Sequence, residues 1–255
     1  MTATPAGITY ADYLALDQLL TAQKPLSSLH DEMLFIVIHQ TKELWLKQML
    51  HELGLAISLL DDDQFAASYK AMARIGRIQS VMTLSWDVLS TLTPVDYTAF
   101  RDVLGTSSGF QSVQFRELEF RLGIKNPRFL EQHEQDSDGH RRLQAALDQP
   151  SLREASHAAL ERAGFDLGDR SEAAVGAAWL QVYQDSERWF DLYQLAEKLV
   201  DIDDALAMWR HKHVLTVERI IGNKMGTGGS AGAAYLRSTL DKRAFPELWS
   251  MRTGL

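Results

Sequence analysis

The chain of 255 residues contains no cysteine. That absence excludes disulfide bonds, cysteine-ligated zinc, iron–sulfur clusters, a haem thiolate and any cysteine nucleophile. A metal held by this protein must therefore be held by histidine, aspartate, glutamate, tyrosine or methionine. The sequence has eight histidines, at positions 30, 39, 51, 133, 140, 157, 211 and 213.

Long apolar runs and basic clusters are missing too. The longest clean apolar run, 33–38, is far shorter than the ~20 residues that a membrane helix needs, and no secretory leader pattern opens the chain. The formal net charge is -8, from 26 basic and 34 acidic residues, and no basic cluster longer than a pair stands out. We therefore expect a cytoplasmic protein with no nucleic-acid partner and no membrane partner.

Proline is scarce, and its placement predicts long helices. The prolines, at 5, 25, 94, 127, 150 and 246, leave 26–93 and 151–245 free of them. The expected helices cover 10–23, 30–60, 63–91, 138–148, 151–163 and 171–221, and further ones begin behind Thr93-Pro94 and Asn126-Pro127. No alternating run framed by a hairpin turn predicts a strand. We expect an all-α bundle of long helices, one domain over 1–255 with a smaller helical excursion around 130–165.

His213 is the most informative residue. On a helix, one apolar stripe contains Leu206, Trp209, His213, Val217 and Ile220. The imidazole of His213 would thus point into an apolar interior, whereas His211 lies about 200° away around the helix. A histidine in that position is either a core side chain bonded to a carbonyl or an axial ligand of a cofactor metal. The stripe leaves both interpretations open.

Two shorter patterns have the same ambiguity. Phe35 and His39, four residues apart, share an apolar helix face, so His39 is either a satisfied buried histidine or a functional one. Tyr97, Arg101 and Leu104 share a stripe of the next predicted short helix. Arg101 either reaches a surface acid or, facing a pocket beside Tyr97, binds a substrate carboxylate through two parallel hydrogen bonds.

The glycine-rich segment 226–232 does not fit a phosphate-binding loop. No predicted strand precedes it, and no Gly-Lys-Ser/Thr ends it. It is either a flexible link between helices or a mobile lid that closes over a small polar ligand with the hydroxyl of Thr227.

Several collinear segments resemble those of the tryptophan 2,3-dioxygenase family of haem enzymes. They are Gly7-Ile-Thr-Tyr-Ala-Asp-Tyr-Leu14, His30-Asp-Glu-Met-Leu-Phe-Ile-Val-Ile-His-Gln40, Glu43-Leu-Trp45, Trp209-Arg-His-Lys-His213, Gly226-Thr-Gly-Gly-Ser230 and Phe245-Pro-Glu-Leu-Trp249. Any one segment is weak evidence for the family, but together the segments cover nearly the whole chain in the order in which the family has them.

The resemblance implies a cytosolic, all-helical homotetramer, built as a dimer of dimers, whose helices enclose a haem pocket. Each subunit would bind haem b with ferrous iron and use O2 as co-substrate. Both oxygen atoms would enter L-tryptophan across the indole C2–C3 bond. The product would be N-formyl-L-kynurenine, in the first step of tryptophan breakdown by the kynurenine route.

The resemblance also implies roles for residues of this sequence. His213 corresponds to the proximal iron ligand, and His39 to the distal histidine that hydrogen-bonds the indole N–H. The pocket corresponds to Phe35, Tyr97, Arg101 and Leu104, with Arg101 on the substrate carboxylate. Thr227 corresponds to the residue that meets the substrate ammonium. An N-terminal helix that reaches over the neighbouring subunit's site corresponds to Tyr10, Tyr13 and Leu14.

Alternatives from other classes remain. A non-enzymatic haem sensor or carrier could use His213 in the same way, although an Arg–Tyr pair for a carboxylate has no purpose there. A helical metal enzyme without porphyrin would need a polyhistidine or histidine–carboxylate site assembled from distant segments.

Overall fold

The computed structural model describes residues 7–135 and 137–255, and every regular element in these ranges is helical. The long helices are α3 (His30–Asp61), α4 (Phe65–Leu89) and α10 (Phe190–Ile221). The shorter ones are α1 (Tyr10–Leu14), α2 (Leu16–Leu19), α5 (Pro94–Arg101), α6 (Val113–Leu122), α7 (Asp138–Asp148), α8 (Leu152–Arg162), α9 (Glu172–Gln184), α11 (Ala233–Arg237) and α12 (Pro246–Ser250). Short 3-10 turns cover Asp102–Leu104, Gly109–Gln111, Pro127–Gln132 and Met251–Gly254. The all-α expectation is confirmed.

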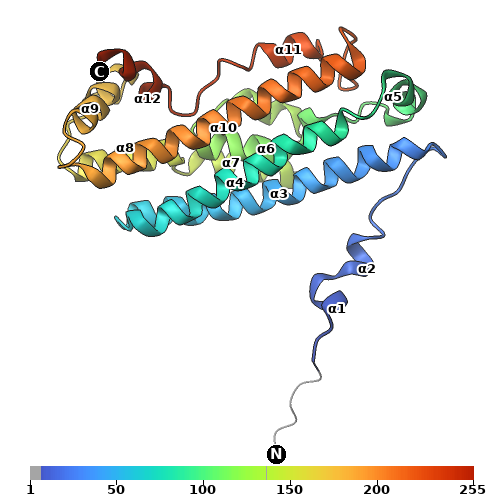
Figure 1. Cartoon of the computed structure of the whole chain (residues 1–255), viewed down its shortest axis with the longest axis horizontal. Helices are drawn as coiled ribbons and strands as arrows, with labels where there is room; N and C mark the ends of the chain where they lie inside the picture. Colours follow the sequence, from blue (N-terminus) through green and yellow to red (C-terminus); the bar gives the residue numbers. More distant parts are fainter. Residues whose placement is uncertain (1–6, 136) are drawn as a thin grey trace, which may run out of the picture.

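Helix α4 lies between α3 and α10 and packs along both of them (Figure 1). Helices α6 and α8 pack against α3 on the side away from the viewer. The main core forms where these helices meet, around fully buried side chains such as Leu53, Met72 and Trp179. A smaller apolar cluster around Trp86, Phe100 and Ile220 fills the end of the bundle near α5. This second cluster adjoins the candidate site.

The structure confirms most predicted helices but corrects the one over 10–23. Its start at Tyr10 is right, but Ala15 adopts the left-handed region (φ 49) and divides it, and α2 ends at Leu19. Neither α1 nor α2 has a buried residue. Short helices without tertiary packing are marginal, so nothing imposes a continuous helix here.

The predicted helix over 171–221 is also wrong in its continuity. Helix α9 ends at Gln184 and α10 begins at Phe190. Asp185 leaves the helical region (φ -132, ψ 57), and Trp189 packs against the ring of Phe165 with centroids 4.9 Å apart. No proline or glycine marks the break, because packing rather than local propensity produces it.

Caps explain where several helices begin. Thr93 accepts a hydrogen bond from the backbone N–H of Asp96 at 3.2 Å and starts α5, as predicted. Asn126 also caps a turn, but that turn is 3-10 rather than α-helical. Helix α6 was not predicted, although Ser112, whose hydroxyl accepts from the N–H of Phe115, is a local signal for it.

The segment around 130–165 divides between two cores. Helix α7 closes a small cluster with α6, in which Leu143 and Phe120 are fully buried. Helix α8 instead joins the main core through Leu152 and Leu160. The expectation of one domain with a local excursion therefore stays a prediction, with α7 as its most separate part.

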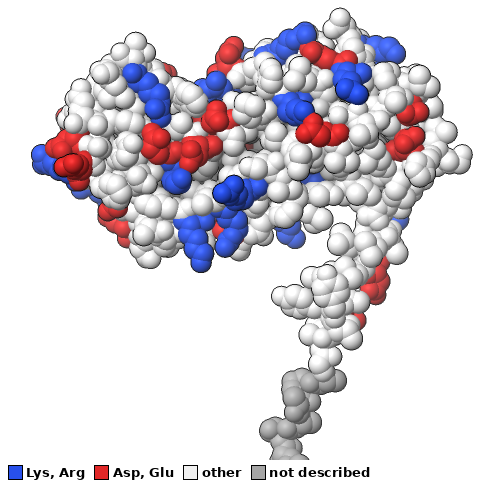
Figure 2. Space-filling model, in the orientation of Figure 1, with Lys and Arg blue, Asp and Glu red and all other residues white. Residues whose placement is uncertain are grey.

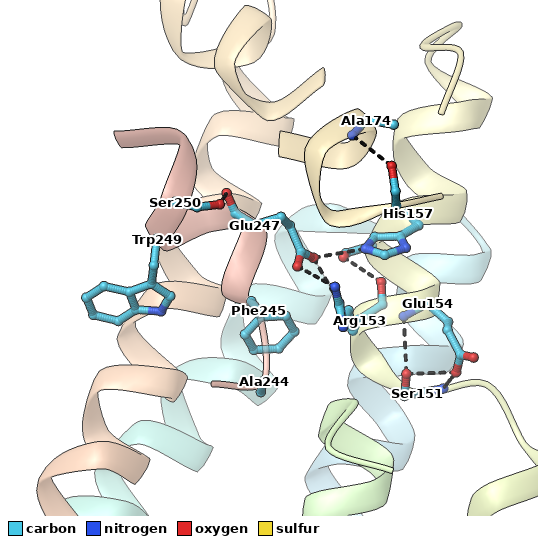
Figure 3. A network of polar contacts seen from close by, with 12 residues as sticks. Ser151, Arg153, Glu154, His157, Ala174, Ala244, Phe245, Glu247, Trp249 and Ser250 are labelled. Atoms are coloured by element: carbon cyan, nitrogen blue, oxygen red, sulfur yellow. Dashed lines mark hydrogen bonds and ion pairs between the residues drawn. The ribbon is translucent and has the colours of Figure 1, made fainter. Parts of the chain in front are cut away.

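Buried carboxylates fasten the C-terminal segment to the bundle. Glu247 lies between Arg153 and His157 of α8 (Figure 3), with its Oε2 2.7 Å from Arg153 Nη2 and its Oε1 2.9 Å from His157 Nε2. Asp203 of α10 accepts hydrogen bonds from the backbone N–H of Ala244 at 3.0 Å and from Trp249 Nε1 at 3.0 Å. The segment 244–249 thus has a structural role.

The N-terminal segment leaves the bundle as an arm (Figure 1). Figure 2 shows charges of both signs intermixed on the visible face of the body, whereas the described part of the arm is mostly uncharged. Tyr10, Tyr13 and Leu26 are exposed by 76%, 75% and 71%. Within 7–135 and 137–255, no helix has the length and apolarity needed to cross a membrane.

Candidate active site

A cavity of about 240 Å³ opens between α3, α4 and α10. Residues from 108–119 and from 226–239 also line it. Its wall is largely apolar and includes Leu46, Met82, Leu89, Val217 and Ile220. A few polar groups interrupt this wall, and they decide what the cavity can bind.

His39 enters the cavity from α3 with a defined tautomer. Its Nδ1 lies 2.7 Å from the carbonyl oxygen of Phe35, one turn earlier, so Nδ1 carries the proton and donates. Nε2 is then an unprotonated acceptor. Burial lowers the pKa of His39 to about 4, and the charge of Lys42 acts in the same direction. His39 therefore presents a neutral acceptor nitrogen at neutral pH.

His213 enters the same cavity from α10. Its ring stacks on the indole of Trp86 of α4, with centroids 4.3 Å apart and planes 12° apart. Burial lowers the pKa of His213 to about 3, with Lys42 and His39 as smaller causes. His211 is exposed on the opposite side of α10. The predicted orientation of the two histidines is thus confirmed, and His213 is a neutral, ligand-competent imidazole.

The side chain of Lys42, one turn after His39 on α3, places an amine inside the cavity. The residue is only 6% exposed, and its Nζ lies 2.9 Å from the ring centroid of Trp86. No hydrogen-bond partner for Nζ exists among the described residues. Burial lowers the pKa of Lys42 to about 6. As the pH falls, Lys42 takes up a proton before the two histidines do, and its charge then opposes their protonation.

Buried ion pairs form the deep wall beside α6. Glu119 accepts from Arg210 Nη2 at 2.8 Å and from Arg116 Nη1 at 2.5 Å. Arg210 also donates to the carbonyl of Lys242 at 2.7 Å. All three charged side chains are nearly inaccessible to solvent, so Glu119 is fully engaged within the protein.

Tyr97, Arg101 and Leu104 lie close together, but only Tyr97 of the three lines the cavity. Tyr97 lines the wall, with its ring 5.8 Å from that of Phe35, while Leu104 packs on the same apolar cluster from outside. Burial raises the pKa of Tyr97, and the charge and hydrogen bond of Arg101 oppose that rise. Arg101 donates to the carbonyl of Met225. The structure thus brings Arg101 next to Tyr97, although only Tyr97 of the pair lines the cavity.

The glycine-rich segment 226–232 contributes to the cavity lining. Thr227 lines the cavity, and its hydroxyl donates to the carbonyl of Ser107 at 2.5 Å. Gly228 passes so close to Ser108 that a Cβ at position 228 would lie 2.6 Å from the Cβ of Ser108. Glycine is therefore required there for the close approach of the two segments. Whether the loop moves on ligand binding stays a prediction.

The remaining predicted residues do not reach this cavity. Tyr10, Tyr13 and Leu14 lie on the exposed arm, and none of them lines the cavity of the chain as described. Their side chains are free to contact another molecule. Their predicted role, in a neighbouring subunit's site, is compatible with this exposure and stays untested.

Ligand groups for a bare metal ion do not gather in the described ranges. Within 7–135 and 137–255, no group of three or more histidine, cysteine, aspartate or glutamate side chains could hold one.

Sequence reasoning missed several groups in the cavity. Trp86 lies on α4 without any local motif, so nothing in the sequence pairs it with His213. Lys42 had a usable signal, because residues three apart share a helix face and His39 precedes it by three. Arg116 and Arg210 could not be found in this way, since Glu119 joins them only in the folded chain.

Comparisons with known proteins identify the family of the chain. The chain matches the family described as tryptophan 2,3-dioxygenase over residues 1–168 and 167–255. A protein named tryptophan 2,3-dioxygenase from Caulobacter vibrioides is 59% identical, over 97% of this chain and 98% of the relative. One from Bacillus cereus is 52% identical, over 98% of this chain and 93% of the relative. With matches of this extent, the chain belongs to the tryptophan 2,3-dioxygenase family.

Proposed function

We propose that this chain is a haem-dependent dioxygenase that inserts both atoms of O2 across the indole C2–C3 bond of L-tryptophan to give N-formyl-L-kynurenine. His213 is the axial ligand of a haem b iron, and His39 receives the indole N–H. One observation carries the proposal. Two neutral imidazoles, held by α3 and α10, enter a single largely apolar cavity that Tyr97 and Thr227 also line, and Arg101 lies beside Tyr97, bonded to the Met225 carbonyl.

The lining of the cavity supports a bound tetrapyrrole. Its aromatic and aliphatic side chains are interrupted by buried polar atoms without a hydrogen-bond partner among the described residues. These atoms are Lys42 Nζ, Trp86 Nε1, Arg116 Nε and Trp209 Nε1. Unsatisfied buried donors are rare in native proteins, so such a cluster indicates a missing polar ligand. When bound, the haem supplies an iron centre that activates dioxygen.

Orientation of the substrate is the task of His39. Its Nδ1–H is already committed to the Phe35 carbonyl, so Nε2 can accept the indole N–H. A neutral indole N–H is too weak an acid for an imidazole of lowered pKa to deprotonate, so His39 orients the ring rather than removing the proton. The ring of Phe35, 4.2 Å from that of His39, extends the apolar surface against which an indole packs.

The amino-acid end of the substrate is bound by Arg101 and Thr227. The guanidinium of Arg101 is suited to two parallel bonds with a carboxylate. Its bond to the Met225 carbonyl would then be exchanged for a bond to a charged acceptor. Thr227, two residues further on, offers its hydroxyl oxygen to the ammonium group. The Thr227 contact links the substrate to the 222–232 loop, which excludes water when closed.

We further propose a homotetramer, a dimer of dimers, in which the arm completes the neighbouring subunit's site. Support comes from the arm itself, which carries Tyr10 and Tyr13 at about three-quarters exposure and buries no residue of α1 or α2. Aromatic side chains exposed to this degree on a short helix are typical of a segment that packs on a partner.

The test is a haem-reconstituted preparation given L-tryptophan, reductant and ¹⁸O2. We expect a Soret band, formylkynurenine absorbance, and product carrying both labelled atoms. A Soret band without turnover would instead support the non-enzymatic haem sensor or carrier. Incorporation of one labelled atom would show a monooxygenase.

The role of Arg101 has a separate test. Arg101→Lys keeps a charge but not the planar fork, so we expect a sharply raised KM for tryptophan with unchanged haem content. Wild-type enzyme should also turn over tryptamine, which lacks the carboxylate, far more slowly than tryptophan. Equal turnover of tryptamine and tryptophan would contradict this role.

A further inference from the structure

Lys42 is one of the unpartnered buried donors of the cavity, and the proposed function assigns it no specific partner. Its amine is buried in the cavity wall, on the same helix face as His39, and it reaches across to the ring of Trp86 on α4. A buried lysine without a hydrogen-bond partner costs free energy, and such groups are normally paired. The amine of Lys42 therefore needs a hydrogen-bond acceptor from a molecule that enters the cavity.

The carboxylates lining this cavity are already engaged. Glu43, next to Lys42 in sequence, accepts from Ser112 Oγ at 2.6 Å and from Gln114 Nε2 at 2.7 Å. Glu119 accepts from Arg116 and Arg210. Neither is bonded to Lys42 Nζ, which has no hydrogen-bond partner in the described ranges. An anion that enters the cavity would supply the missing acceptor.

His39 cannot take the place of Lys42 toward an anion. Because its Nδ1–H is donated to Phe35, its Nε2 faces the cavity as an acceptor, which repels an anion and suits an indole N–H. On the α3 wall, the free donor is then the amine of Lys42. The two side chains divide the work: one accepts from the substrate, and the other can donate to a negatively charged group.

We propose that Lys42 makes this cavity an anion site, with Nζ as hydrogen-bond donor to a small anion bound between the α3 wall and the His213 wall. The inference rests on the proposed haem site, in which such an anion is the exogenous ligand of the iron. Its chemical class is a small inorganic anion. The carboxylate of tryptophan, bound by Arg101, is a different anion at a different place.

The low pKa of Lys42, about 6, is consistent with this role. In an apolar wall the amine stays neutral and does not repel the histidines. An anion beside it favours the ammonium form, because an opposite charge raises the pKa of an amine. Binding of the anion is then accompanied by the uptake of one proton by the Lys42 amine.

The experiment uses the ferric, haem-loaded protein and titrates fluoride and azide as probes, followed by the visible spectrum per haem. Lys42→Met removes the donor and keeps an unbranched side chain. The control is Lys47→Met, on the same helix but exposed to solvent. Losing a charged hydrogen bond should raise the dissociation constants of both anions by about ten- to a hundredfold in Lys42→Met. We expect no change in Lys47→Met.

A neutral probe separates this role from a general change of the pocket. Imidazole should bind Lys42→Met at least as tightly as wild type, since it needs no counter-charge. In the ferrous carbon monoxide complex, the C–O stretch should move to higher frequency in Lys42→Met, because a positive donor beside the ligand lowers that frequency. Lys42→Gln, which keeps a weaker neutral donor, should fall between wild type and Lys42→Met in both measurements.

Several outcomes would overturn the inference. Unchanged anion affinity in Lys42→Met, with normal haem content, would mean that Nζ does not face the ligand. Loss of haem from both Lys42→Met and Lys42→Gln, or lowered haem affinity with unchanged anion binding, would mean that Lys42 pairs with the porphyrin instead. A wild-type chain without a Soret band would overturn the proposed function, and this inference with it.

Discussion

A single main-chain carbonyl decides what His39 can do. With Nδ1–H held by Phe35, the cavity-facing nitrogen accepts and does not donate. The residue type alone leaves both tautomers open, so the chemistry of this position comes from the helix turn that precedes it. For His213, a ring on another helix is decisive: the stack against Trp86 of α4 sets the plane of the imidazole.

Haem retention should depend on His213 and not on its near neighbour. His213→Ala should purify with little haem or with an altered axial ligand, because the one imidazole on the α10 wall is lost. His211→Ala is the matched control, since His211 points to solvent. Absorption spectra and haem-to-protein ratios measure both. Haem loss in His211→Ala, with a normal spectrum in His213→Ala, would reverse the assignment.

The amine of Lys42 should make stability depend on pH in the haem-free chain. Its folded pKa of about 6 lies below the ordinary value of 10.5, so the unfolded chain binds more protons between these values. Wild-type stability is therefore lost as the pH falls from about 10 toward 6. Lys42→Met lacks this penalty and should be more stable at pH 7.

The advantage of Lys42→Met should shrink by up to about 1.4 kcal/mol for each pH unit between 7 and 9. Urea unfolding of both haem-free proteins at pH 7, 8 and 9 measures it. A difference in unfolding free energy that stays constant with pH would mean that Lys42 is protonated in the folded chain across this range.

At the scale of elements, helix α10 joins the candidate site to the C-terminal anchor. It carries His213 near one end and Asp203, which holds the segment 244–249, further back. Helix α12 is too short to persist alone, and its position depends on Asp203 and on the Glu247 contacts with α8. Burial alone would raise the pKa of Glu247, but His157 and Arg153 lower it below its ordinary value.

Breaking this anchor should reduce stability without touching the chemistry. Glu247→Gln leaves Arg153 and His157 without their carboxylate and should cost about 1–3 kcal/mol of unfolding free energy. The control Glu161→Gln breaks an exposed pair with Arg170 and should cost less than about 1 kcal/mol. Chemical denaturation compares them, and turnover per haem should be unchanged in both. Equal losses in the two variants would show that the buried network adds nothing.

At the scale of the whole molecule, the arm is the feature that a single chain leaves unexplained. Its described part extends away from the bundle (Figure 1), and its residues Tyr10, Tyr13 and Leu14 do not line the cavity of their own chain. If the proposed tetramer forms, its mass in solution is about 115 kDa, four times the 28.7 kDa chain. Light scattering measures this mass directly.

Mixed assemblies can test whether the arm acts on a neighbour. One parent carries Tyr13→Ala with an intact cavity, and the other carries Arg101→Ala with an intact arm. Random co-assembly in equal amounts should recover about a quarter of wild-type activity, since half of the cavities are intact and half of those receive an intact arm. Activity no higher than that of the parents would mean that the arm serves its own chain or none.

The sequence by itself determined the all-α class, most helix starts and the family. These depend on local patterns: proline placement, caps such as Thr93, and apolar spacing, which act over a few residues. It also placed His39 and His213 on apolar faces, because helical periodicity alone decides which residues share a face.

Tertiary structure decided the rest. The breaks at Ala15 and 185–189, the stack of Trp86 on His213, and the pairing of Glu119 with Arg116 and Arg210 join or separate segments that no local pattern relates. Lys42 shows the difference most clearly. The spacing of residues on α3 predicts that Lys42 shares a helix face with His39. That its amine has no hydrogen-bond partner depends on the folded cavity, because the neighbouring acceptors are bonded to other groups.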